Sequence, residues 1–165
     1  MKLKKLFILP FLLSFVFLTS CEKDEEEIEY VATYPVSGTW AVTYNVETSP
    51  GQFEAITDPT TVSIYNTAAN KPDRIWIDDL EHFWHFKVNA PVDMTNLSFA
   101  GSELTNESYE SEVTVTEGKV IKGGSMVKGA PTDSIYFQVS FSDDGTAANP
   151  DPYGTIYHVF GHRAF

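Results

Sequence analysis

Alternation of apolar and polar residues is the feature of this sequence that most limits what the chain can fold into. Successive side chains of a β-strand point to opposite faces, so a period of two marks a strand with one buried face. Two stretches show this period clearly. The apolar members are Trp40, Val42, Tyr44 and Val46 in the first, and Ile135, Phe137, Val139 and Phe141 in the second. Both stretches therefore predict half-buried strands.

Shorter stretches of the same kind lie between turn-forming residues. We expect strands over Thr61–Tyr65, Arg74–Asp78, His82–Val88, Leu97–Phe99 and Tyr153–Phe160. A hairpin is expected over residues 113–122 with its tight turn at Glu117-Gly118, and further turns at Asn89-Ala90-Pro91 and Gly123-Gly124. About eight short strands indicate a sandwich or a barrel. Because closure removes exposed strand edges, we favour an all-β, antiparallel barrel with little helix.

Residues 1–20 have the pattern of a lipoprotein signal peptide. Lysines precede the apolar run Leu6–Leu18, which is shorter than the roughly 20 residues that a spanning helix needs. Small residues then lead to Cys21, the only cysteine. We expect lipidation of Cys21 to anchor the protein in the outer membrane, since two or more acyl chains anchor stably. Ordinary secretion is the alternative.

Residues 21–33 are expected to be the lipidated cysteine and a solvated acidic tether, and residues 34–165 to be one barrel domain. The Lys23-Asp24-Glu25 run is similar to the surface-export signal of lipoproteins in Bacteroidota, which implies exposure on the cell surface. The formal net charge is −12 before the signal lysines are removed. Such acidity argues against nucleic-acid partners and against membrane contact beyond the anchor. A monomer is expected.

The aromatic residues of the chain are candidates for an apolar binding site. Large apolar residues occupy both expected faces around residues 74–88, more than a strand buried on one side needs. This excess is explained by core packing, by a ligand pocket or by a partner interface. The candidates for lining a pocket are Trp40, Tyr44, Trp84, Phe86, Phe137 and Tyr157.

No catalytic set, metal site or cofactor site is visible in the sequence. Ser37, Ser125 and Ser134 are not distinguished from ordinary strand and turn serines. His82 and His85 are three residues apart, so an ideal strand points them to opposite faces, which does not suit one zinc ion. The loop with Asp143 and Asp144 is expected to be a solvated hairpin loop.

Both ends of the domain carry a family resemblance. The opening stretch is Tyr34-Pro35-Val36-Ser37-Gly38-Thr39-Trp40, and the closing stretch ends in Gly161-His162-Arg163-Ala164-Phe165. With the lipidation motif, these resemble the Bacteroidota lipoproteins labelled "lipid-binding putative hydrolase". The resemblance implies a lipocalin-like barrel with a pocket for an apolar ligand. It supplies no catalytic residues.

The Gly38-Thr39-Trp40 element also resembles the one with which lipocalins close one barrel end. A basic residue from the last strand covers the tryptophan there, and this resemblance implies a cation–π contact between Arg163 and Trp40. Arg163 departs from the usual pattern because it is expected to follow the strand.

We therefore expect a surface-anchored binding protein for an apolar or amphipathic, lipid-like small molecule. The alternatives are a glycan-binding or scaffold accessory of a nutrient-uptake system, and a weak esterase. Enzymatic activity stays open, because the family label implies a hydrolase while the sequence shows no catalytic set.

Overall fold

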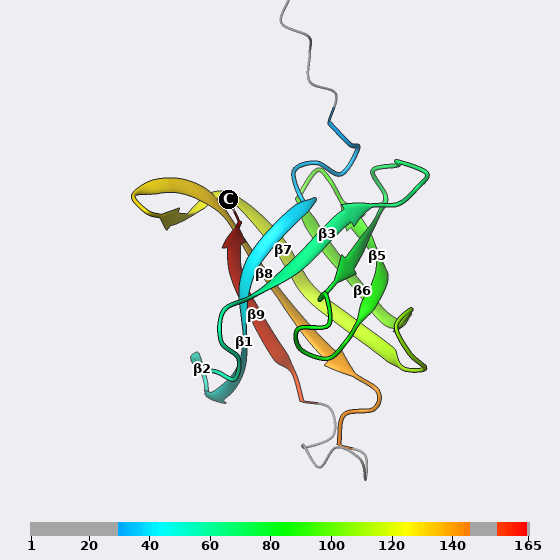
Figure 1. The fold of residues 1–165 in the computed structure, drawn as a ribbon, viewed down its shortest axis with the longest axis vertical. Coiled ribbons are helices and arrows are strands. Elements are labelled where there is room, and N and C mark those ends of the chain that lie inside the picture. Colours follow the sequence, from blue (N-terminus) through cyan, green and yellow to red (C-terminus); the bar gives the residue numbers. More distant parts are fainter. Residues whose placement is uncertain (1–29, 146–154, 165) are drawn as a thin grey trace, which may run out of the picture.

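A computed structural model describes residues 30–145 and 155–164, which form one antiparallel sheet of nine strands (Figure 1). The strands are β1 Gly38–Ser49, β2 Gln52–Ala55, β3 Thr60–Asn66, β4 Arg74–Asp78, β5 Lys87–Asp93, β6 Ser98–Thr105, β7 Glu112–Val127, β8 Ala130–Phe141 and β9 Tyr157–Arg163. No helix occurs within these two ranges.

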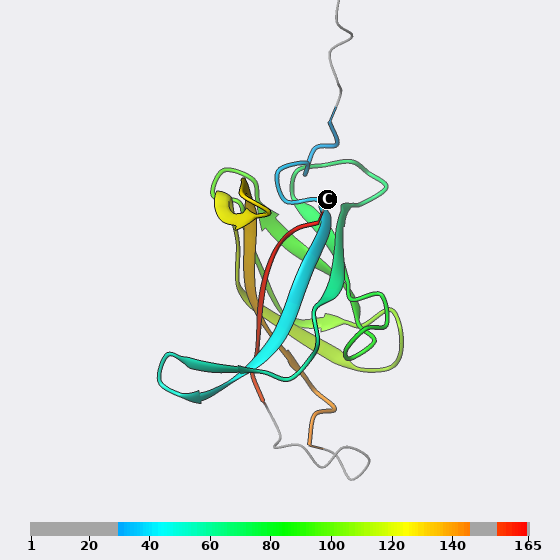
Figure 2. The same cartoon turned by 60° about the vertical axis from the view of Figure 1, so that its left-hand side comes forward.

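The sheet closes on itself. From β3 to β9 each strand pairs with the next, and β1 pairs with both β3 and β9. Eight strands therefore form a barrel, while β2 folds back on the far part of β1 as an additional hairpin strand that projects from the side (Figure 2). The predicted antiparallel barrel of about eight strands is confirmed.

Alternate residues of the strands fill the interior, as the period of two predicts. Trp40, Val42 and Tyr44 of β1 are buried, and so are the four apolar members of the predicted strand in β8. Ile75 and Ile77 of β4 are also fully buried. The barrel therefore has an aromatic and β-branched core built from inward-facing side chains.

The hairpin predicted around Glu117-Gly118 is wrong, because β7 runs through this position as a bulge. Glu117 takes the left-handed backbone conformation with φ 54°. At Gly118 a Cβ atom would lie 2.3 Å from the ring and from the carbonyl oxygen of Phe99. The bulge at Glu117-Gly118, whose residue types also suit a tight turn, bends the long strand β7 and brings it close to β6. Gly123-Gly124, also predicted as a turn, lies within the same strand at a second change of register.

Two further assignments differ between residues 79 and 93. The predicted strand His82–Val88 is wrong over most of its length, since residues 79–86 form a loop and β5 begins at Lys87. Asn89-Ala90-Pro91, predicted as a turn, is part of β5. Tyr153, the expected start of the last strand, lies outside the described residues.

One end of the barrel, which we call the Trp40 end, is closed by the chain that precedes β1. Arg163 lies in β9, and its guanidinium carbon is 4.4 Å from the centre of the Trp40 ring, so the predicted cation–π contact is confirmed. The guanidinium also donates to the carbonyls of Ser37 (2.7 Å) and Pro35 (3.0 Å). A Cβ on Gly38 would lie 2.3 Å from Arg163 Nη1, which explains the glycine.

The opposite end, which we call the loop end, carries the β4–β5 loop (79–86), the β6–β7 loop (106–111) and residues 142–145 after β8. Figures 1 and 2 show these segments at the end away from the C-terminus and from the first described residues. This end holds the candidate site.

Candidate functional site

Five of the six predicted lining residues are buried in the barrel, and Trp84 is half-buried at its loop end. Trp40 belongs to the closed Trp40 end, and Phe137 contacts Phe99 with ring centres 5.8 Å apart. The structure brings the remaining predictions together with two rings that were not predicted. This aromatic cluster consists of Tyr44, Phe83, Trp84, Phe86, Phe141 and Tyr157.

Two stacked pairs organise the aromatic cluster. Phe83 stacks on Tyr44 with ring centres 4.1 Å apart, and Trp84 stacks on Phe141 at 4.8 Å. Tyr157 lies between the two pairs, with its ring centre 5.0 Å from that of Phe83 and 5.7 Å from that of Trp84. Adjacent residues of one loop thus place two large rings over the inward-facing rings of β1, β8 and β9.

The carboxylate of Asp79 holds this loop in shape. It is buried and accepts five backbone N–H groups at 2.9–3.2 Å, from Glu81, Phe83, Trp84, His85 and Phe86. Its oxygens thus satisfy backbone N–H groups that would otherwise form the hydrogen bonds of a paired strand. This is the physical reason that residues 82–86 are not a strand.

The loop backbone is strained at three positions. Leu80, Glu81 and His85 have φ values of 55°, 64° and 57°, in the left-handed region that non-glycine residues rarely adopt. Such strain persists only where the surroundings impose it, and it concentrates at ligand clamps and other functional sites. Here Asp79 imposes it, and the result is a loop that presents Phe83 and Trp84 to the barrel interior.

Neighbouring loops fix the outer side of the same loop. The buried Asn106 side chain accepts the Lys87 N–H at 3.0 Å and donates to the His85 carbonyl at 3.4 Å. Asp143 accepts the indole N–H of Trp84 at 3.3 Å and the Tyr109 hydroxyl at 2.8 Å. Burial and the Asp143 contact raise the pKa of Tyr109, so this donor stays protonated at neutral pH.

Asp144 is fully buried, so the prediction of a solvated loop is wrong at this residue. Its Oδ2 accepts the Thr155 N–H at 3.1 Å and the Tyr157 hydroxyl at 3.3 Å. Within residues 30–145 and 155–164, its Oδ1 and the hydroxyl of Tyr44 are the buried side-chain oxygens without a hydrogen-bond partner. Burial, with a smaller contribution from the negative charge of Asp79, raises the pKa of Tyr44 well above its usual value.

The sequence did not identify Asp79, Phe83, Phe141 and Asp144 as residues of the site. The available signal was the position of Asp79, directly after a predicted strand and four residues before Phe83-Trp84. Acidic residues at strand ends are common and usually solvated, so this signal alone did not distinguish a buried acceptor.

The serines and histidines that were weighed for chemistry are spread over the barrel. Ser134 lies opposite His162 in the β8–β9 register, and no hydrogen bond joins their side chains in the described structure. The neighbouring Asp133 accepts Arg163 Nε at 3.3 Å. His85 contacts Glu81 at 3.1 Å, whereas His82 contacts Thr61. Among the described residues, no three metal-binding side chains gather at one point.

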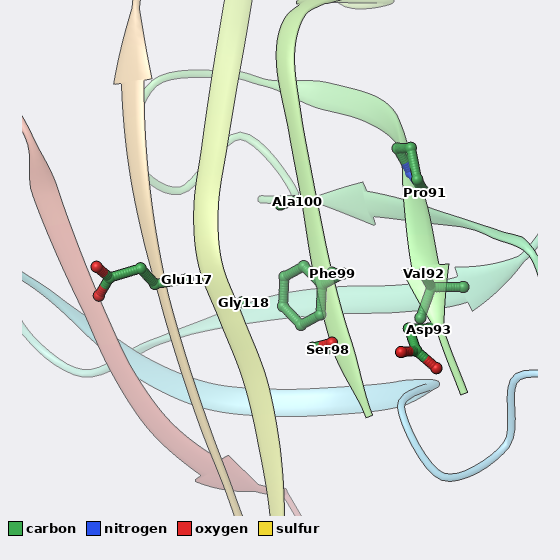
Figure 3. A pocket seen from close by; sticks show the side chains of 8 residues that line it. All are labelled: Pro91, Val92, Asp93, Ser98, Phe99, Ala100, Glu117 and Gly118. Carbon is green, nitrogen blue, oxygen red and sulfur yellow. The ribbon is translucent and has the colours of Figure 1, made fainter. Parts of the chain in front are cut away.

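A hollow opens in the barrel wall, where the pairing of β5 with β6 is limited to Val92 with Phe99 and Asp93 with Ser98. It has a volume of about 280 Å³, and the Phe99 ring and Gly118 lie at its centre (Figure 3). Its carboxylates are already used, since Asp93 accepts from Thr95 and Asn96 and Glu117 accepts from Gln138. The wall hollow therefore offers a ligand fewer unsatisfied groups than the loop end does.

Comparison with known proteins identifies a family for this chain. No curated protein matches the chain. In the part of the chain that the structure describes, no helix is long and apolar enough to cross a membrane. The lipid-binding role implied by the family label is consistent with a closed barrel whose loop end is lined by aromatic rings. The family model described as lipid-binding putative hydrolase matches residues 25–164, and the chain therefore belongs to this family.

Proposed function

We propose that this protein binds an apolar or amphipathic small molecule at the loop end of its barrel. The observation that carries the proposal is the aromatic cluster, in which a strained loop places Phe83 and Trp84 over the inward-facing rings of Tyr44, Phe141 and Tyr157. Rings supplied by a loop are displaced more readily than rings on paired strands. The family label supports a lipid-like ligand.

The proposed binding step exchanges one apolar contact for another. An acyl or alkyl chain takes the place of Phe83 or Trp84 against Phe141 and Tyr157, so the barrel interior stays dry. Each buried methylene contributes about 0.8 kcal/mol, so roughly ten supply about 8 kcal/mol before the costs of association and of moving the loop. Chains of this length are therefore sufficient for measurable affinity.

We also propose that the protein is anchored in the outer membrane through a lipid on Cys21 and faces the cell exterior. Cys21 lies outside the described residues. The described chain begins at Tyr30, next to the Trp40 end (Figure 1). The anchor then joins the barrel at the end opposite the proposed site. Cys21→Ser should move the protein from the membrane to the soluble fraction, and protease treatment of whole cells should digest the barrel of the parent protein. Retention of Cys21→Ser in the membrane fraction would contradict the anchor, and a barrel protected from the protease would contradict exposure on the cell surface.

Binding is tested on the full chain carrying Cys21→Ser, in detergent-free buffer, with decanol as the probe. We expect a saturable change in tryptophan fluorescence and a bound species in native mass spectrometry. Trp84→Phe should remove most of the fluorescence change, whereas the matched control Trp76→Phe should keep it, because Trp76 lies on the outer face of β4. No saturable binding of decanol, decylamine or decanoate would reject the proposal.

A second candidate function has its own observation. The rings of Phe53 in β2, Tyr136 in β8, and His158 and Phe160 in β9 form an aromatic group on the outside of the barrel. His158 is buried within this group, whereas Phe53, Tyr136 and Phe160 are partly exposed. Beside the group lies a hollow of about 330 Å³ that Phe160 and His162 help to line. Such rings suit stacking on a saccharide, as a glycan-binding accessory requires. Phe160→Ala should then reduce retardation of the protein in gels that contain soluble polysaccharide. Equal mobility of both proteins in every gel would remove this candidate.

A further inference from the structure

Two buried oxygen atoms at the loop end have no partner within the described residues, and they define the head group that the site can accept. They are the hydroxyl oxygen of Tyr44 and Oδ1 of Asp144, and both residues are fully buried. A buried polar atom without a partner costs about 1–3 kcal/mol, so such atoms are rare in native structures and call for an explanation.

Both atoms belong to residues of one contiguous group. Tyr44 stacks on Phe83, the Phe83 ring contacts Tyr157, and the Tyr157 hydroxyl donates to the other oxygen of Asp144 at 3.3 Å. Phe83, which connects them, is one of the two rings that the proposed ligand displaces. A ligand chain in that place would bring its polar end within the same group.

The chemistry of these atoms is selective. Asp144 presents an acceptor only, when ionised, and Tyr44 presents a hydroxyl that donates or accepts. The carboxylate of Asp79 adds a second negative charge near Tyr44 and contributes to the raised pKa of the Tyr44 hydroxyl, which burial mainly causes. A carboxylate or phosphate head group would meet two buried negative charges and would leave Oδ1 of Asp144 without a donor. An alcohol or an amine supplies that donor.

We infer that the ligand is an amphiphile whose head group donates hydrogen bonds, an alcohol or an amine, and that Asp144 and Tyr44 receive it. This inference rests on the proposed function, since it names the class of ligand for the same site. It excludes fatty acids, the simplest lipids, as the preferred ligands.

The test compares three probes with one chain length: decanol, decylamine and decanoate. Dissociation constants are measured at pH 7 by tryptophan fluorescence on the full chain carrying Cys21→Ser. We expect decanol and decylamine to bind about tenfold or more tightly than decanoate, because decanoate leaves a buried carboxylate oxygen unpaired beside another negative charge. Asp144→Asn should reduce the preference for decylamine over decanoate by about tenfold, and Tyr44→Phe should weaken decanol binding several-fold.

The control for charge alone is Glu110→Gln. Glu110 is exposed in the β6–β7 loop at the same end of the barrel, so its substitution removes one negative charge without reaching the interior. It should leave the ratio of decylamine to decanoate affinity unchanged. If Asp144→Asn does not fold, the Tyr44→Phe comparison still decides the question, since that change removes one oxygen atom only.

Three results would overturn the inference. Equal affinity for the three probes, or tighter binding of decanoate, would show that the head group is not recognised in this way. A preference that survives both substitutions, or that changes equally in Glu110→Gln, would assign it to general surface charge. Binding of none of the probes would reject the proposed function itself, and the inference with it.

Discussion

Replacing Tyr44 by phenylalanine should stabilise the unliganded protein, although the residue is completely buried. The substitution removes the hydroxyl and keeps the ring, including its stack on Phe83 at 4.1 Å. Truncating a buried polar residue normally costs stability, because a hydrogen bond is lost. Here the described structure shows no hydrogen bond to that hydroxyl, so none is lost.

The magnitude follows from two opposing contributions. Removing a buried hydroxyl without a partner recovers about 1–3 kcal/mol of desolvation cost. The void left by one oxygen atom is smaller than a methyl group, and a void of methyl size costs about 1 kcal/mol. The free energy of unfolding should therefore rise by about 1 kcal/mol, which for a domain of this size corresponds to a Tm increase of roughly 4 °C.

Equilibrium urea unfolding at pH 7, followed by circular dichroism and tryptophan fluorescence, measures this change. The m-value should stay constant, since the surface exposed on unfolding is almost unchanged. Tyr157→Phe is the matched control: its hydroxyl donates to the Asp144 carboxylate, so the same substitution should there lower the free energy of unfolding by about 1–2 kcal/mol. A loss of comparable size in Tyr44→Phe would refute the reasoning, because it would give the Tyr44 hydroxyl a partner in the free protein.

Three further predictions concern the loop, the closed end and alkaline pH. Asp79→Asn removes the negative charge that accepts five backbone N–H groups, so it should lower the free energy of unfolding by about 3 kcal/mol or more. It should also shift the fluorescence emission of Trp84 to longer wavelength. An unchanged urea midpoint and unchanged emission would contradict the role of Asp79. Gly38 has a φ of 146°, and Gly38→Ala would place a Cβ atom against the Arg163 guanidinium. The change should lower the free energy of unfolding by about 2 kcal/mol and alter the near-ultraviolet circular dichroism of Trp40. A thermal midpoint equal to that of the parent protein would show that Arg163 moves aside freely. Burial raises the folded-state pKa of Tyr44 above 10.0, so the neutral hydroxyl contributes stability that is complete below pH 10 and is lost as pH rises through the folded-state pKa. Above pH 10, Tyr44→Phe should therefore lose less stability than the parent protein. Identical alkaline unfolding curves for the two proteins would exclude this contribution.

The sequence predicted which side chains lie inside the barrel far better than it predicted where strands begin and end. Trp40, Val42 and Tyr44 are buried because strand geometry alone sends every second side chain to one face. The contact between Arg163 and Trp40 was also predicted, although the two residues are far apart in the sequence, because the resemblance of Gly38-Thr39-Trp40 to lipocalins implied it. The Glu117-Gly118 prediction failed because the same residue types make a tight turn or a bulge, and only the pairing of β7 with both β6 and β8 selects the bulge.

The sequence by itself thus determined the all-β class and the inward-facing core of the strands, since these depend on local chain geometry and side-chain polarity. The tertiary structure decided barrel closure, the loop at residues 79–86 and the burial of Asp79 and Asp144. An acidic residue is buried only where donors from other parts of the chain meet its oxygens, as the Thr155 N–H and the Tyr157 hydroxyl meet Asp144. Because these hydrogen-bond partners come from distant parts of the chain, the burial of such a carboxylate cannot be predicted from a short stretch of sequence.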